Sequence, residues 1–271
     1  MLSKLIELWK YRELVRNLVE RDLKVRYKNS VLGIAWSWLN PLLMMLVFTL
    51  VFDVIGFGRQ DIGHYPVYFL AGILPWNMFS ASVVGATASV VSNGYLIKKV
   101  YFPREVLPLT VVLSNTVNFC ISLPVFFVVA LVLGVHFTPW VLLMPFVLAV
   151  QVIFSVGIGL ILATLNVYYR DTQIIMEVLM LAWFFVTPIF WDQSILATKT
   201  LSVLGMALPM RQLVYYLNPM ASIIASYRDT MYWGWQPALD FFVRSAGTAV
   251  IILVIGYLVF HRFSAYFAEE L

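Results

Sequence analysis

The sequence has little charge, and this scarcity limits what the protein can be. Only 12% of its 271 residues are Asp, Glu, Lys or Arg, whereas 62% are hydrophobic. Soluble domains carry about 25% charged residues, so the composition excludes an ordinary soluble protein and indicates an integral membrane protein. The 18 basic residues outnumber the 14 acidic ones. In a membrane protein this excess follows from topology, and we expect no nucleic-acid binding.

Cysteine and histidine are also scarce. The single cysteine, Cys120, excludes an intramolecular disulfide. The histidines at 64, 136 and 261 lie far apart, so they form neither a metal-ligand pattern nor a catalytic triad. The basic N-terminus is unlike a cleaved signal peptide, because its charges continue to Lys28. We expect no metal or cofactor in this chain.

The sequence also lacks the motifs by which a transporter uses ATP or an ion gradient as its energy source. It contains no G-x-x-x-x-G-K-[ST] loop, so it does not hold ATP by that route. No acid or base lies in the middle of an apolar run, since Asp53 and Glu177 are near the ends of such runs. Ion-driven carriers usually need ionisable groups inside the membrane. These absences exclude the usual enzymatic chemistry and predict a pore or scaffold that a partner drives.

The stretch 21–52 contains the clearest topological signal. A basic block at Arg21, Lys24, Arg26 and Lys28 is followed by residues 29–52, which carry no formal charge. About 20 apolar residues are enough to span a bilayer as a helix. Basic residues favour the cytoplasmic side, so the block is predicted to be cytoplasmic.

Charge-free runs predict the other elements of an all-α integral membrane protein with six transmembrane helices. The expected spans are residues 31–52, 62–97, two spans within 106–169, 174–191 and 245–260. Both termini are then cytoplasmic, and 13 of the 18 basic residues fall in segments expected on that side. The chain forms one domain, 1–271, with a six-span region at 31–262 and a cytoplasmic tail at 263–271.

Two segments are too polar or too short to span. Residues 3–27 predict an amphipathic N-terminal interface helix, with Leu8, Tyr11, Val15 and Leu18 on one face; a soluble capping helix is the alternative. The segment 192–244 is apolar but interrupted by charges. Its pieces 202–217 and 220–235 predict either re-entrant helices between spans 5 and 6 or a small external cap.

Aromatic residues are abundant, with 20 Phe, 14 Tyr and 9 Trp. Most such residues belong to the belts at membrane surfaces. Several of them lie near predicted span ends or kinks and are candidates for lining a glycan channel, because aromatic faces stack on sugar rings. These candidates are Trp36, Trp38, Trp76 and Tyr168.

Short blocks across nearly the whole chain resemble the permease subunits of bacterial ABC exporters for cell-surface polysaccharides. The blocks are R-D-L-K-V-R-Y-K-N-S-V-L-G-I-A-W (21–36), N-P-L (40–42), G-I-L-P-W-N-M-F (72–79), K-K-V-Y-F-P-R-E (98–105), L-N-V-Y-Y-R-D (165–171), T-P-I-F (187–190) and L-N-P-M (217–220). The family exports O-antigen, capsule or teichoic acid, and the resemblance is closest to the O-antigen type.

The resemblance implies both an architecture and a setting. It implies six spans, an interface helix and re-entrant helices in a homodimer whose channel lies at the dimer axis. The permease would lie in the bacterial cytoplasmic (inner) membrane. Two separate partner subunits would bind ATP and Mg²⁺. The cargo would be a lipid-linked glycan. The alternatives are an ABC exporter permease for a lipid or drug, a membrane-embedded glycosyl- or acyltransferase, and a scaffold without transport.

The resemblance also implies roles for particular residues. Those expected to dock the ATPase subunit are Lys98, Lys99, Tyr101, Phe102, Pro103 and Arg104. Arg170 and Asp171 are candidates for a gate or cytoplasmic brace, and the basic block Arg21, Lys24, Arg26 and Lys28 for contact with the lipid pyrophosphate. In each case the alternative is that the charged residues only set the membrane topology or bind lipid headgroups.

Overall fold

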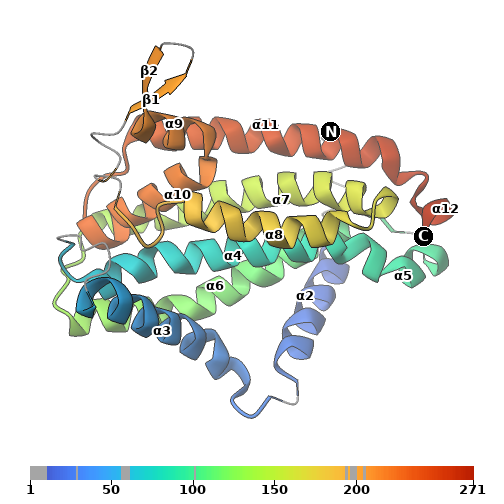
Figure 1. Cartoon of the computed structure of the whole chain (residues 1–271). Coiled ribbons are helices and arrows are strands. Elements are labelled where there is room, and N and C mark those ends of the chain that lie inside the picture. Colours follow the sequence, from blue (N-terminus) through green and yellow to red (C-terminus); the bar gives the residue numbers. More distant parts are fainter. Residues whose placement is uncertain are drawn as a thin grey trace.

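The computed structural model describes residues 11–28, 30–55, 62–100, 102–192, 195, 200–203 and 206–271. Four long helices lie side by side and form the body of the molecule (Figure 1). They are α4 (Tyr65–Ser92), α6 (Val106–Val132), α7 (Met144–Tyr168) and α11 (Leu239–Ser264). Each includes a predicted charge-free run or part of one, because a helix satisfies its own backbone hydrogen bonds inside a membrane; α11 also extends into charged residues on both sides of its run.

Five helices in the described part of the chain are long and apolar enough to cross a membrane. They cover Gly33–Phe52, Tyr65–Ser92, Val106–Val132, Pro139–Tyr168 and Leu239–Ser264. The predicted fifth span corresponds to α8 (Thr172–Val186), which has only 15 residues. At 1.5 Å per residue this helix is about 22 Å long, shorter than a hydrocarbon core of about 30 Å. The six-span prediction therefore does not follow from helix length alone.

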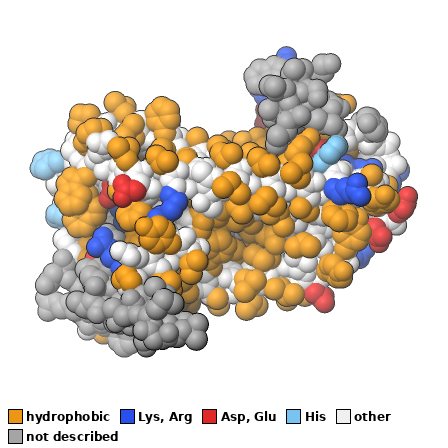
Figure 2. All heavy atoms as spheres, turned by 90° about the horizontal axis from the view of Figure 1, so that it is seen from above, with side chains coloured by type: hydrophobic (Ala, Val, Ile, Leu, Met, Phe, Trp, Pro, Cys, Tyr) orange, Lys and Arg blue, Asp and Glu red, His pale blue; other side chains and the backbone are white. Residues whose placement is uncertain are grey.

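The surface agrees with a membrane setting. Figure 2 shows hydrophobic side chains over the middle of the molecule, whereas charged side chains gather toward its two ends. Exposed apolar residues on the spans include Leu142 and Val132, at 77% and 79% exposure. Such a continuous apolar band is costly in water but is the normal lipid-facing surface of a spanning bundle.

The N-terminal part of the described chain forms two helices that diverge. Helix α2 (Arg12–Tyr27) crosses α6. The short turn η1 (Gly33–Ala35) then leads into α3 (Trp36–Thr49), which continues into the π-helical turn η2 (Leu50–Val54). The predicted apolar face of α2 is confirmed, because Leu18 is buried and Tyr11 and Val15 pack beside it. Residues 3–10, including Leu8, lie outside the described residues.

The segments predicted to be cytoplasmic gather at one end of the bundle (Figure 1). Within the predicted span 62–97, helix α4 ends at Ser92 and a separate helix, α5 (Gly94–Lys99), follows it. The C-terminal helix α12 (Phe267–Glu270) contacts α5 and α7 at the same end. A core cluster joins these parts to α2, through Leu18, Ile97 and Phe102.

The segment between α8 and α11 corrects two predictions. The piece 202–217 was predicted to be a re-entrant helix or part of an external cap, but it is helical only from Met210. Before that residue the chain forms a hairpin of β1 (Thr200–Val203) and β2 (Met206–Pro209). The helices α9 (Met210–Leu217) and α10 (Pro219–Arg228) and the π-helical turn η5 (Asp229–Trp233) follow. Helix α11 then begins at Leu239 rather than at 245, because the charge of Arg244 is satisfied within the fold. Its Nη2 donates to the Tyr215 carbonyl and to Ser222 Oγ, both at 3.0 Å.

Candidate functional site

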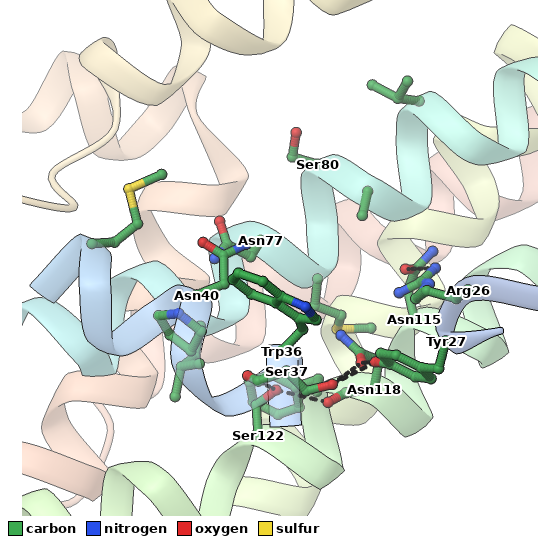
Figure 3. A pocket seen from close by; sticks show the side chains of 17 residues that line it. Arg26, Tyr27, Trp36, Ser37, Asn40, Asn77, Ser80, Asn115, Asn118 and Ser122 are labelled. Atoms are coloured by element: carbon green, nitrogen blue, oxygen red, sulfur yellow. Dashed lines mark hydrogen bonds between the residues drawn. The ribbon is translucent and has the colours of Figure 1, made fainter. Parts of the chain in front are cut away.

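A cavity of about 590 Å³ lies between α2, α3, α4 and α6 (Figure 3). Its size falls within the usual range for small-molecule sites, about 300–1,000 Å³. Its lining is polar for a space between membrane helices. The polar residues are Arg26, Tyr27, Ser37, Asn40, Asn77, Ser80, Asn115, Asn118 and Ser122, and the others are Trp36, Pro41, Met44, Leu74, Met78, Ala81, Val84 and Phe119.

Helical spacing explains how uncharged runs build this polar wall. On α6, Asn115, Asn118 and Ser122 recur at i, i+3 and i+7, so they share one face. The same spacing places Ser37 and Asn40 together on α3, and Asn77 and Ser80 together on α4. These faces converge on the cavity (Figure 3).

One side of the cavity is a connected hydrogen-bond network. The Tyr27 hydroxyl and Ser37 Oγ both lie within hydrogen-bonding distance of Asn118 Oδ1, Ser37 at 2.9 Å, and of one another, so the two hydroxyl protons are shared among these three contacts. Ser122 Oγ donates to the Ser37 carbonyl at 3.2 Å. This network ties the end of α2 to α3 and α6, so it holds that wall in one arrangement.

Among the described lining residues, Arg26 is the one cation and there is no acid. Arg26 Nη2 donates to Asn115 Oδ1 at 2.8 Å, and Asn115 Nδ2 donates to the Val111 carbonyl at 2.9 Å. The remaining polar groups are amides and hydroxyls. The described residues that line the cavity offer no carboxylate, thiol or imidazole to act as a nucleophile or general base. Its chemistry therefore suits binding of an anionic or hydroxyl-rich group rather than covalent catalysis.

The structure separates the four aromatic channel candidates. Trp36 lines the cavity and is 44% exposed. Trp38 is partly exposed, and its Nε1 donates to the Ile121 carbonyl of α6 at 2.7 Å. Trp76 is 4% exposed, packed among aromatic rings that include Phe79 and Trp183, so it lies in the core.

Tyr168 lies elsewhere, near the end of the bundle that carries α12. Its ring contacts those of Phe263 and Phe267, with centroids 5.8 Å and 6.5 Å apart. Only Trp36 of the four candidates therefore lines the cavity described above.

The basic block is likewise divided. Arg26 reaches the cavity, whereas Arg21 pairs with Asp22 at 3.3 Å and Lys24 with Glu20 at 3.8 Å on the exposed side of α2. Lys28, which follows the last residue of α2, is exposed. Folding therefore joins one predicted pyrophosphate contact, Arg26, to one predicted glycan contact, Trp36.

The predicted docking loop borders a second cavity, of about 610 Å³, at the end of the bundle that carries α5 and α12. Its charged lining consists of Lys98, Lys99, Arg104 and Glu105, and its other residues are His261, Ile97, Val100, Phe102, Pro103, Ser264 and Ala265. The lysines are exposed, and Lys99 Nζ lies 4.1 Å from the centroid of the Tyr95 ring. This surface is accessible and predominantly basic.

Other members of the docking set have different surroundings. Phe102 is 9% exposed and packs in the core cluster that also holds Leu18, so in this structure it anchors the loop from within. Tyr101 lies outside the described residues. Arg104 is half-buried, and its Nη1 has no hydrogen-bond partner among the described residues.

The gate candidates Arg170 and Asp171 are both exposed in the turn between α7 and α8. The Asp171 carbonyl accepts the Ile175 amide at 2.9 Å and so begins α8. Within the described ranges their side chains form no ion pair with one another.

Sequence reasoning missed the amide and hydroxyl residues of the first cavity. The missed asparagines are Asn40, Asn77, Asn115 and Asn118. They carry no formal charge, so a search for interruptions in uncharged runs passes over them. A search for asparagines recurring at helical spacing within the predicted spans would have found the pair on α6.

The chain is similar to known transport proteins along its whole length. The family model described as ABC-2 type transporter matches residues 13–232. An O-antigen export system permease protein RfbA from Myxococcus xanthus is 36% identical over 271 residues, all of both chains. Two proteins of the same name from Klebsiella pneumoniae are 33% and 30% identical, each covering 94% of this chain and 93% of its own length. The chain therefore belongs to the ABC-2 type transporter family of multi-pass membrane permeases.

Proposed function

We propose that this chain is the transmembrane subunit of an ATP-driven exporter that moves a lipid-linked, O-antigen-like polysaccharide across the bacterial inner membrane. The observation that carries the proposal is the polar cavity beside α3, in a chain similar from end to end to O-antigen export permeases. One cation, an exposed indole and several amides suit a ligand that joins a phosphate to sugars. A drug or simple lipid would favour a more apolar lining.

In the proposed assembly, two copies of the chain form a homodimer with the glycan path between them. Two partner subunits hydrolyse ATP with Mg²⁺ and dock on the loop around Lys98 and Lys99, with both termini of the permease on that cytoplasmic side. The α8 helix completes the set of six spans, and α9 and α10 are re-entrant. The burial of eight of the ten residues of α10 supports this assignment, because irregular backbone at membrane depth must lie within protein.

The packing supplies a route from the docking loop to the cavity. Phe102 of the loop shares a core cluster with Leu18 of α2, and two turns later α2 places Arg26 and Tyr27 in the cavity. A displacement of the loop would therefore move α2 as a rigid element and alter the network at Ser37 and Asn118. Arg170 and Asp171 would limit this movement from the neighbouring turn.

The test is co-purification with a candidate ATPase subunit from the same organism, with mass spectrometry of the bound lipid. We expect a complex of two permeases and two ATPases that carries a lipid-linked glycan, and loss of surface polysaccharide when the gene is deleted. A chain that recruits no ATPase, or a deletion that leaves the surface glycan intact, would contradict the proposal.

A double charge reversal tests the docking surface. Lys98→Glu with Lys99→Glu should reduce the amount of co-purified ATPase at least tenfold, because both side chains are exposed and basic. The matched control is Arg262→Glu, an exposed reversal near the end of α11 but outside the second cavity. Equal recovery of the ATPase with both variants would place the docking surface elsewhere.

A further inference from the structure

We propose that Asn40, Asn77 and Ser80, with the ring of Trp36, form a subsite that binds a single uncharged sugar ring. This inference rests on the proposed function, since it specifies which part of the cargo the first cavity recognises. It concerns the end of the cavity between α3 and α4, away from the hydrogen-bond network around Tyr27 (Figure 3).

The side chains at this end lack partners. Those of Asn40, Asn77 and Ser80 make no hydrogen bond to any part of the chain that the structure describes. By contrast, the cavity residues Asn115 and Asn118 are both hydrogen-bonded. The polar side chains on one wall of the cavity are thus hydrogen-bonded to one another, whereas those on the other wall have donors and acceptors available for a ligand.

Membrane depth makes these free groups informative. Asn77 lies twelve residues after Tyr65, the first residue of α4, which ends at Ser92. It is therefore about 18 Å from the start of that helix and near its middle. An amide without a partner costs several kcal/mol in hydrocarbon, and polar side chains within spans usually mark a functional path. Water alone or a hydroxyl-rich ligand would satisfy these groups.

The indole favours the sugar over water alone. Trp36 is 44% exposed, lines the same cavity and lies beside Asn40 and Asn77 in Figure 3. Exposure of so large an apolar ring to a water-filled cavity is unfavourable. A pyranose offers both an apolar C–H face for the ring and hydroxyls at its edge for amides. The combination of one aromatic face and two amides matches that amphipathic shape.

The charge distribution indicates a neutral ring. The charged side chain of the lining, Arg26, lies on the opposite side of the Trp36 ring from Asn40 and Asn77 (Figure 3). A carboxylate on the sugar would lose its hydration here without gaining a cation. A phosphate joined to the sugar could instead reach toward Arg26. The subsite therefore selects uncharged sugars, whereas Arg26 serves the anionic linkage.

The test measures binding to the purified permease–ATPase complex with four probes. They are farnesyl diphosphate and its conjugates with glucose, N-acetylglucosamine and glucuronic acid. We expect the two neutral conjugates to bind about tenfold more tightly than farnesyl diphosphate, from one or two additional hydrogen bonds and ring stacking. The glucuronic acid conjugate should gain nothing. A neutral sugar that adds no affinity to the wild-type complex overturns the subsite.

Substitutions assign that gain to particular residues. Asn40→Leu and Asn77→Leu, made separately, should each remove most of the tenfold gain, measured relative to the binding of farnesyl diphosphate by the same variant. Gln212→Leu, an exposed amide on α9, is the matched control and should keep the gain. A gain that survives both asparagine substitutions would also overturn the proposal.

The two proposals fail in different ways. If all four probes bind equally and gene deletion abolishes the surface glycan, the subsite is wrong and the export function stands. If deletion leaves the glycan intact and no probe binds, the export function itself is wrong, and the subsite is lost with it.

Discussion

At the residue scale, Arg228 is a buried cation whose guanidinium group is hydrogen-bonded to backbone carbonyls. It is 5% exposed, its Nη1 donates to the Pro188 carbonyl at 2.6 Å, and its Nη2 donates to the Ile189 carbonyl. Its guanidinium carbon lies 3.7 Å from the centroid of the Tyr68 ring. A Cβ added to Gly72 would lie 2.7 Å from Nη2, so that glycine makes room for it. Arg228 thus satisfies carbonyls freed where Pro188 prevents continuation of α8.

Arg228→Met should lower the free energy of unfolding by about 3 kcal/mol, because it removes charge-assisted hydrogen bonds and leaves buried carbonyls unpaired. Arg228→Lys should recover only part of the loss, since one ammonium lacks the planar fork and the stacking. Chemical unfolding in mixed micelles at pH 7.5 measures the free energy of unfolding of the wild type and both variants. Burial raises the pKa of the adjacent Asp229 carboxyl to about 6, so it stays mainly ionised at that pH.

Arg262→Met, an exposed residue near the end of α11, is the control for Arg228 and should change stability by less than about 0.5 kcal/mol. Equal stability of the Arg228→Met and wild-type chains would show that the two carbonyls find other partners and that this arginine is dispensable for the fold.

At the element scale, α7 and α11 approach one another through glycines. A Cβ added to Gly256 of α11 would lie 2.3 Å from the Gly157 carbonyl oxygen of α7. A Cβ added to Gly157 would lie 2.6 Å from the Leu253 amide nitrogen. Small residues let membrane helices pack at this distance, where van der Waals contact replaces the hydrophobic effect as the main source of association.

Gly256→Ala should therefore destabilise the permease by about 1–3 kcal/mol, as overpacking of a close helix contact does. Gly247 is the matched control on the same helix, since a Cβ added there meets nothing within 4 Å. Gly247→Ala should be neutral or stabilising by up to about 1 kcal/mol, because alanine favours a helix more than glycine. Thermal unfolding in detergent compares the two. Similar losses for both variants would contradict the close contact.

At the scale of the whole molecule, α8 is an apolar helix that the rest of the chain leaves largely uncovered, since only Met176 and Met180 of its 15 residues are buried. At 15 residues it is shorter than the other proposed spans, and its residues Val178 and Leu181 are 65% and 61% exposed. A short helix with a broken end is better tolerated against protein or a cavity than against lipid. This placement supports α8 at the axis of the proposed homodimer.

In a Cys120→Ser background, Val178→Cys should cross-link the two copies with a short bifunctional maleimide. A two-fold axis brings the same position of both copies together, so a single substitution is enough. The control is Val128→Cys on α6, which is similarly exposed at 59%. Cross-linking of the control but not of Val178→Cys would move the axis to α6.

The sequence by itself determined the membrane class, the long helices and the family. These follow from the lengths of uncharged runs and from ordered sequence blocks, which are local properties of the chain. The positions of Trp76 and Phe102 did not follow, because burial depends on which helix face meets a neighbour. Nor did the β1–β2 hairpin or the start of α11 within a charged segment, since Arg244 is satisfied by distant groups.

Only the tertiary structure decided the candidate site. Arg26 and Trp36 stood out in the sequence, but fourteen other residues were candidates beside them, and the two belonged to different predicted sites. Asn40 and Asn77 lie on different helices and carry no formal charge, so no local pattern connects them. They meet because α3 and α4 bury their apolar faces and leave these amides at a shared cavity. A site formed by the faces of separate helices depends on packing, which local sequence patterns do not describe.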